Sequence, residues 1–141
     1  KIVDFGLKDS MNMGPCMAPA AASSIEQHFI DFNSQPSNYD KIITGDLGVV
    51  GQKVLFDLLK DRGYDITEQH MDCGIEIFDA ATQDTHSGGS GCGCSAATLS
   101  AYILKQIEEK QYAAGLEGKG IPREHIRSYG VAFQGKKVLI G

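Results

Sequence analysis

The sequence predicts an α/β fold in which a mostly parallel or mixed sheet is covered by helices. Two observations support this prediction. Short apolar segments at residues 2–7, 41–44 and 73–78 have the composition of strands, and they alternate with longer segments whose apolar side chains recur every three or four positions. Strands that alternate with helices of this length are typical of a parallel sheet with both faces covered.

The N-terminal part begins with the strand at residues 2–7 and a turn-rich segment at residues 8–15. A helix is predicted next, with Pro19 in its first turn, where the missing N–H is tolerated. The apolar positions of this helix, which runs to residue 33, are Ala22, Ile25, Phe29 and Phe32. Residues 34–38 combine serine, proline and asparagine, so they are expected to break the helix.

The middle part contains the strand at residues 41–44 and a second helix that follows Gly48. The predicted apolar stripe of this helix consists of Val50, Val54 and Leu58, with Leu55 and Leu59 beside them. Gly63 is expected to stop the helix, because glycine adopts the left-handed conformation common after a helix end.

The third strand, residues 73–78, is followed by a loop and then by a third helix over residues 92–110. The apolar positions of this helix are Ala96, Leu99, Ile103, Leu104 and Ile107. The tail, residues 112–141, begins with a linker rich in glycine and charge. Its apolar segments at residues 129–133 and 138–140 predict a terminal hairpin.

Charge and hydropathy argue against two classes of function. The formal net charge is -5 and the pI is near 5.2, which argues against a surface that binds nucleic acid. The longest apolar run is far shorter than the ~18–20 residues that span a bilayer, so we expect no transmembrane segment and only peripheral membrane association. The chain begins at Lys1 without an initiator Met or a leader, and it is therefore expected to be a fragment or a processed form.

The four cysteines, Cys16, Cys73, Cys92 and Cys94, do not have the paired spacing of a zinc site. Without a secretory leader, reduced thiols are expected rather than disulfides. Free cysteine is among the most often buried residues, so packing is the expected role of all four. A helix N-terminus at Cys92 would instead favour its thiolate, and this alternative stays open.

The most distinctive stretch is residues 87–97, which contains only Gly, Ser, Cys and Ala. Glycines bring the backbone close to a ligand or to another segment, and a helix N-terminus offers free N–H groups and a positive dipole end. The stretch therefore predicts either an anion-binding site or a helix that enters a crowded interior. The candidate ligand-binding residues are Asp46, His86, Gly88, Gly89, Ser90, Gly91, Cys92, Gly93, Cys94 and Ser95. No residue is assigned to catalysis or to a metal, and no cofactor is expected.

Four short motifs occur together in a characteristic order and spacing: residues 17–22, 43–47, 72–74 and 88–96. In this combination the chain resembles the stage V sporulation protein AD family of the thiolase-like superfamily. The resemblance covers residues 1–111 and matches the C-terminal half of such proteins. It implies a layered αβα half-domain whose third helix is a central helix, buried along its length. Residues 112–141 do not resemble the family and are expected to form a divergent tail.

Enzymes of this superfamily need a nucleophilic cysteine, together with His or Asn groups that polarise a thioester carbonyl. The resemblance places the nucleophile in the N-terminal half, which is expected to be missing here. At the position of the first catalytic histidine this chain has Asp46, which cannot donate a hydrogen bond when ionised. The second position falls within residues 87–97, which contain neither His nor Asn. A non-catalytic protein is expected; the alternative is an acyl-CoA thiolase or a ketoacyl-synthase-like condensing enzyme.

The resemblance implies that the ligand is dipicolinic acid (pyridine-2,6-dicarboxylate), free or as its Ca2+ chelate, during uptake into or release from bacterial spores. Its carboxylates need donors and its ring needs an apolar slot. Backbone N–H groups of residues 88–94 and the hydroxyls of Ser90 and Ser95 are candidates for one carboxylate, and His86 or His70 for the other. Asp46 either lines the site through its backbone, contacts chelated Ca2+, or is a strand-end residue.

The same resemblance implies other stage V sporulation A proteins as partners, and a peripheral location at the inner membrane of the spore or forespore. Half of a pseudo-symmetric fold exposes a large apolar face, so the isolated chain is expected to self-associate, for example as a homodimer. A third interpretation is that the chain acts only as a structural or interaction module.

Overall fold

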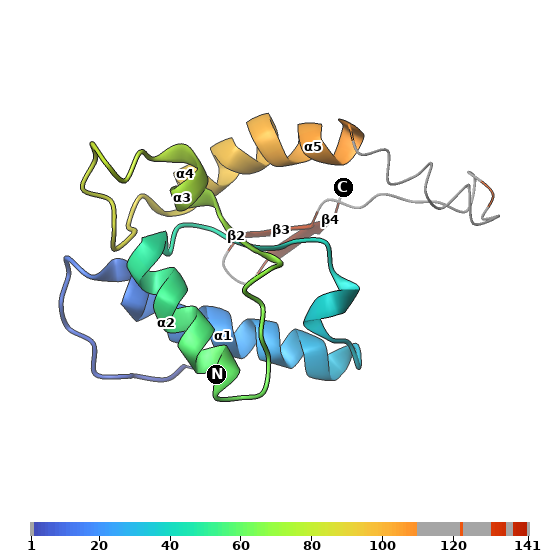
Figure 1. Ribbon diagram of the computed structural model, residues 1–141, viewed down its shortest axis with the longest axis horizontal. Coiled ribbons are helices and arrows are strands. Elements are labelled where there is room, and N and C mark those ends of the chain that lie inside the picture. Colours follow the sequence, from blue (N-terminus) through green and yellow to red (C-terminus); the bar gives the residue numbers. More distant parts are fainter. Residues whose placement is uncertain (1, 110–121, 123–130, 135–136, 141) are drawn as a thin grey trace. The chain divides into compact units, whose positions relative to one another are not determined.

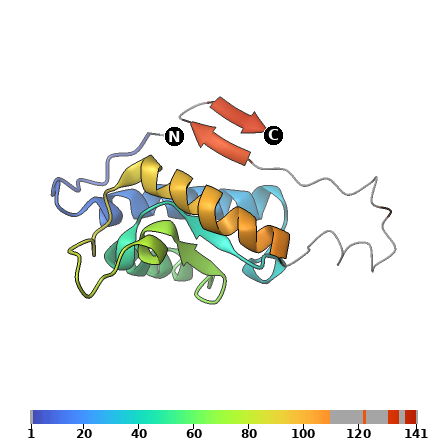
Figure 2. The same cartoon turned by 90° about the horizontal axis from the view of Figure 1, so that it is seen from above.

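The computed structural model describes residues 2–109, 122, 131–134 and 137–140. The chain divides into two compact units, Lys1–Tyr102 and Ile103–Gly141. In the first unit, two helices lie on one side of a small sheet and a third helix lies on the other (Figures 1 and 2). These helices are α1 (Met13–Asp31), α2 (Gly48–Lys60) and α4 (Gly91–Thr98). The predicted α/β class is confirmed.

The sheet of the first unit has two parallel strands, β1 (Ile42–Thr44) and β2 (His70–Asp72). Helix α2 connects them, because parallel neighbours need a crossover rather than a tight turn. In the second unit, β3 (Val131–Gln134) and β4 (Lys137–Ile140) pair antiparallel, at the residues where the sequence predicts a hairpin.

The prediction for the N-terminal segment is wrong. Residues 2–7 form no strand, and Phe5 is 58% exposed, because no described strand pairs with this segment. Helix α1 begins at Met13, so Pro15 rather than Pro19 lies in the first turn. Pro19 lies inside the helix and is buried.

The core of the first unit lies where α1 packs against α2. Its buried apolar residues are Ala18, Ala22, Phe29, Leu47, Leu55, Leu59 and Ile66. The buried stripe of α2 passes through Gly51, next to the predicted Val50, which is exposed. A Cβ on Gly51 would lie 2.7 Å from the carbonyl carbon of Gly14, so the two helices meet through their backbones at this point. As predicted, Gly63 follows α2 in the left-handed conformation (φ +88°), and α1 ends before residues 34–38. The loop after α1 also contains a short 3-10 helix, η1 (Pro36–Asn38), which was not predicted.

The third predicted strand is shifted along the chain. Strand β2 precedes it, and most of the predicted segment 73–78 is a short helix, α3 (Cys73–Ile77). Asp72 causes this change, because its carboxylate accepts hydrogen bonds from the backbone N–H groups of Gly74 (3.1 Å) and Ile75 (3.3 Å) and so caps the helix. The apolar composition of this segment, with Ile75 and Phe78 expected to be half-buried, predicted a strand, and the cap overrides that preference.

The third predicted helix is confirmed in position, whereas its burial is not. Helix α4 continues through a π-helical turn, η2 (Leu99–Ile103), into α5 (Leu104–Glu109). Within residues 91–102 only Cys94 and Thr98 are buried, and Tyr102 is 42% exposed. Buried positions four residues apart mark a single covered face, against which α3 packs. The expectation of a helix buried along its length is therefore wrong for this unit.

Candidate functional site

A cavity of about 430 Å³ lies at the carboxyl end of β1, between α1 and the start of α4. Its apolar walls come from Met17, Ala21, Ile25, Ile43 and Leu47. The polar and small lining residues are Ser24, Thr44, Gly45, Asp46, Gly91, Cys92 and Ser95. An apolar cavity with a few polar groups is the usual form of a small-molecule site. The cavity brings together four predicted site residues: Asp46, Gly91, Cys92 and Ser95.

Asp46 is 5% exposed, and its carboxylate faces the loop before α4. Its Oδ2 accepts hydrogen bonds from the backbone N–H groups of Gly89 (3.0 Å) and Ser90 (2.6 Å), and from the Ser90 hydroxyl. Its Oδ1 is buried without a hydrogen-bond partner among the described residues, and it lies against Gly74, where a Cβ would collide with it. The donors of Gly89 and Ser90, which the sequence offered to a ligand, therefore bind a carboxylate of the protein itself.

Glycines with positive φ shape the loop that Asp46 holds. The φ angles of Gly88, Gly89 and Gly91 are +71°, +128° and +68°. Gly88 is also closely packed, since a Cβ there would lie 2.9 Å from the carbonyl carbon of Leu47. Glycine alone combines this conformation with this approach. Gly88 is therefore a packing residue, whereas Gly91 lines the cavity and has open space around it.

The first turn of α4 provides free donors at the edge of the cavity. The backbone N–H groups of Gly91, Cys92 and Gly93 have no acceptor among the residues that the structure describes. The Ser95 hydroxyl lies 3.4 Å from the carbonyl oxygen of Gly91, to which it donates. Because the positive end of the helix dipole lies at the same place, this edge of the cavity favours an anion. The other predicted residues, His86, Gly88, Gly89, Ser90, Gly93 and Cys94, do not line the cavity.

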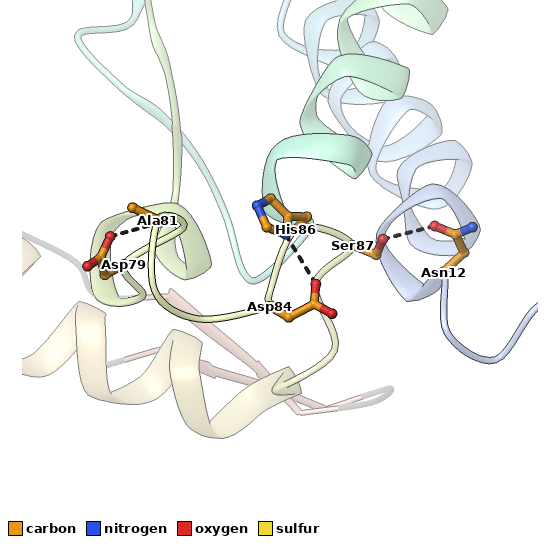
Figure 3. Close-up of polar contacts among 6 residues, drawn as sticks. All are labelled: Asn12, Asp79, Ala81, Asp84, His86 and Ser87. Atoms are coloured by element: carbon orange, nitrogen blue, oxygen red, sulfur yellow. Dashed lines mark hydrogen bonds and ion pairs between the residues drawn. The ribbon is translucent and has the colours of Figure 1, made fainter.

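His86 lies on the exposed loop between α3 and α4 (Figure 3). Its Nδ1 is 3.2 Å from the carboxylate of Asp84, and its side chain is 47% exposed. The next residue, Ser87, donates its hydroxyl to the side-chain oxygen of Asn12 (2.9 Å), and its carbonyl accepts from the N–H of Gly14. These contacts hold the loop on the N-terminal end of α1 and keep His86 outside the cavity.

His70 is buried on β2 and belongs to a chain of polar side chains. Its Nε2 is 3.0 Å from the hydroxyl of Thr44, and its Nδ1 is 3.0 Å from the amide nitrogen of Gln52. Because the Thr44 hydroxyl donates to Asp72 (2.6 Å), it accepts from Nε2–H, and Nδ1 accepts from Gln52. Burial lowers the pKa of His70 to about 4, against a smaller opposing effect of the Asp72 charge. The neutral imidazole thus joins β1, β2 and α2.

Asp72 is the most connected side chain near the site, and sequence reasoning assigned it no role. It is 1% exposed and accepts five hydrogen bonds. The donors are the Thr44 hydroxyl and the backbone N–H groups of Leu47, Gly48, Gly74 and Ile75. Asp72 therefore fixes the turn after β1 next to the turn after β2. Asp72 is of a residue type that commonly caps helix N-termini, and this was the available signal for the cap.

The four cysteines are free thiols in two different environments. Cys73 and Cys94 are buried, which confirms the packing prediction for them, whereas Cys16 and Cys92 are exposed and the prediction is wrong there. Burial raises the pKa of the Cys73 thiol to about 11, so this thiol stays protonated and unreactive at neutral pH. Cys92 lines the cavity.

Fold and site together define a class: an α/β protein with an apolar cavity at the end of a parallel strand, bordered by a helix N-terminus. Within the described part of the chain, no helix has the length and hydropathy needed to cross a membrane.

Comparison with known proteins gives the family. The model of the family described as stage V sporulation protein AD matches residues 1–116. Stage V sporulation protein AD of Bacillus subtilis (strain 168) is 46% identical over 109 residues, which are 77% of this chain and 32% of that protein. The chain therefore belongs to the stage V sporulation protein AD family, as its motifs predicted. It spans about a third of the length of this curated relative.

Proposed function

We propose that this chain forms part of a non-catalytic sporulation protein that binds dipicolinate, and that the cavity at the end of β1 receives the ligand. Membership of the stage V sporulation protein AD family supports a role in sporulation. The observation that supports the ligand most strongly is the cavity, which has apolar walls and free N–H groups at one edge. The pyridine ring would lie between Ile25 and Ile43, with a carboxylate at the N–H groups of Gly91 and Cys92.

The second carboxylate of dipicolinate needs further positive charge. The cavity lining contains hydroxyl groups, but among the described residues it contains no Lys or Arg. The hydroxyl of Thr44 already donates to Asp72, so it is not free for the ligand. The negative charge of the second carboxylate is then balanced by groups beyond this chain or by chelated Ca2+. The proposed setting is peripheral at the inner membrane of the spore or forespore, together with other stage V sporulation A proteins.

Three features support a role without catalysis. The Asp46 carboxylate is bound to the loop before α4 and is not free to act on a substrate. The thiol of Cys73, which has a raised pKa, does not line the cavity, and the described lining residues include no His or Asn. Acyl transfer requires His or Asn side chains at the reacting carbonyl, to polarise it and to transfer protons. The alternative, an acyl-CoA thiolase or a condensing enzyme, predicts measurable thioester turnover by the full-length protein, whereas this proposal predicts none.

Isothermal titration of the full-length protein with dipicolinate, with and without Ca2+, tests the proposed ligand. Replacing Cys92 by Phe fills the edge of the cavity, so we expect affinity to fall at least about tenfold. The matched control is Cys16→Phe, the same change at another exposed cysteine that does not line the cavity, and it should bind normally. Absence of binding by the unmodified protein at millimolar ligand, or equal losses in both variants, would contradict the proposal.

A further inference from the structure

Asp46 lines the cavity, but its carboxylate is not available to a ligand there. Three donors from Gly89 and Ser90 surround Oδ2. Oδ1 is sealed from solvent against Gly74, so close that a Cβ at residue 74 could not be accommodated. A bound molecule in the cavity therefore meets the backbone and the Cβ side of Asp46 rather than its charge.

We infer that Asp46 is a positioning residue: its carboxylate holds Gly89 and Ser90 so that Gly91 and Cys92 form the donor-bearing wall of the cavity, and it contacts neither ligand nor cation. The inference rests on the proposed function, since it concerns the same cavity. Of the three roles that the sequence left open for Asp46, it selects the one in which the residue lines the site without offering its carboxylate.

Packing does not hold the end of the loop, at Gly89 and Gly91, in place, which is why the carboxylate matters there. The nearest atom to a Cβ built on Gly89 is the Cγ of Met13 at 3.7 Å, and nothing lies within 4 Å of a Cβ on Gly91. Both glycines also have positive φ and a broad choice of backbone conformations. Fixing such a segment is entropically costly. The hydrogen bonds to Asp46 Oδ2 are the contacts that offset this cost.

The same geometry argues against a direct contact between Asp46 and chelated Ca2+. Ca2+ takes six to eight oxygen ligands at about 2.3–2.6 Å, and it needs open carboxylate oxygens. Oδ2 is saturated by donors, and Oδ1 faces Gly74 instead of the cavity. Removing the charge while keeping the acceptor should therefore preserve the site.

Two substitutions of Asp46 in the full-length protein distinguish a role in positioning the loop from direct contact of its charge with the ligand. Asp46→Ala removes the acceptor and should weaken dipicolinate binding at least about tenfold. Asp46→Asn keeps an acceptor oxygen for Gly89 and Ser90 and places an amide where Oδ1 has no partner, so binding should be rescued to within about threefold of the unmodified protein. The matched control is Asp79→Ala, because Asp79 holds the backbone N–H of Ala81 (2.9 Å) in the same loop, away from the cavity (Figure 3).

Each outcome decides between specific roles. An Asn variant as impaired as the Ala variant, above all in the presence of Ca2+, would overturn the inference, because the charge would then contact the ligand. An Ala variant with a lowered melting temperature but normal affinity would overturn it as well, since the role would be structural only. If the unmodified protein binds no dipicolinate, the proposed function fails, and amide hydrogen exchange still tests the inference: exchange at Gly89 and Ser90, whose N–H groups donate to Asp46, should accelerate in Asp46→Ala and not in Asp46→Asn. Unchanged exchange in the Ala variant would contradict it.

Discussion

At the scale of single residues, two aspartates near the carboxyl ends of the strands organise the backbone around the cavity. Asp72 binds the turn after β1 and the turn after β2, and Asp46 binds the loop before α4. The sequence marks Asp46 as a polar residue after a predicted strand, whereas it gives Asp72 no role. Their partners could not be predicted, because most are backbone N–H groups distant in sequence, as Gly89 and Ser90 are from Asp46. The N–H groups of the glycine-rich stretch were predicted to bind an anionic ligand. In the structure, those of Gly89 and Ser90 bind the carboxylate of Asp46.

The buried imidazole of His70 predicts a pH dependence of folding stability. Its pKa is lowered from 6.5 to about 4 in the folded chain, so between these values the unfolded chain binds the proton more readily. The contribution of His70 to the free energy of unfolding is therefore complete above about pH 6.5 and is lost as the pH falls towards about 4. At about 1.4 kcal/mol per pKa unit, the loss is on the order of 3 kcal/mol.

Denaturant unfolding of the unmodified chain and of His70→Gln, at several pH values from 4 to 7.5, checks this expectation. Gln keeps a donor and an acceptor near Thr44 and Gln52 but has no proton to gain. The unmodified chain should lose stability through this range more steeply than the variant. Parallel pH profiles would show that His70 does not control the acid sensitivity.

At the scale of elements, the periodicity of apolar residues predicted which segments are helical better than which residues they bury. Helix α2, the helical segment that begins with α4, and β1 lie close to their predicted positions, whereas α1 begins earlier than predicted and α3 was predicted as a strand. The buried stripe of α2 passes through Gly51 because a glycine lets α1 approach, and a hydrophobicity pattern gives glycine no weight. The segment at residues 73–78 has the apolar composition of a strand, yet the cap from Asp72 makes most of it helical. Local side-chain to backbone bonds of this kind compete with that preference.

Two helical glycines offer a matched pair of substitutions that tests this close approach. In Gly51→Ala the new Cβ would lie 2.7 Å from Gly14, so we expect a loss of about 1–3 kcal/mol in the free energy of unfolding. In Gly93→Ala nothing lies within 4 Å of the new Cβ, so better helix propensity should stabilise the chain by about 0.5–1 kcal/mol. Thermal and denaturant melts measure both. Equal effects of the two changes would mean that α1 and α2 do not meet through their backbones.

At the scale of the whole molecule, motif order predicted the family and the fold class, whereas the environment of each element was less predictable. Residues 2–7 have the composition of a strand, and Val3, Phe5 and Leu7 are exposed because no described strand lies beside them. Helix α4 was expected to begin a helix buried along its length, and within the first unit it has one covered face. Both differences concern what packs against a segment rather than the segment's own structure. The chain spans about a third of the length of its curated relative, so its sequence carries only part of the information on what packs against each segment.

Exposed apolar side chains predict that the isolated chain self-associates. Phe5 and Phe32 are 58% and 70% exposed, and Leu99 and Tyr102 are also open to solvent. Burying such surface is favourable at roughly 25 cal/mol per Å². Light scattering over a concentration series should therefore show an apparent mass that rises with concentration. A monodisperse monomer at all concentrations would contradict this expectation.

The central claim is that the cavity between α1, β1 and α4 receives dipicolinate, and a crystal structure of the full-length protein with the ligand tests it most directly. We predict the pyridine ring between Ile25 and Ile43, one carboxylate within hydrogen-bond distance of the N–H groups of Gly91 and Cys92, and no contact with the carboxylate of Asp46. Dipicolinate bound at a different surface, or an empty cavity at saturating ligand, would contradict the claim.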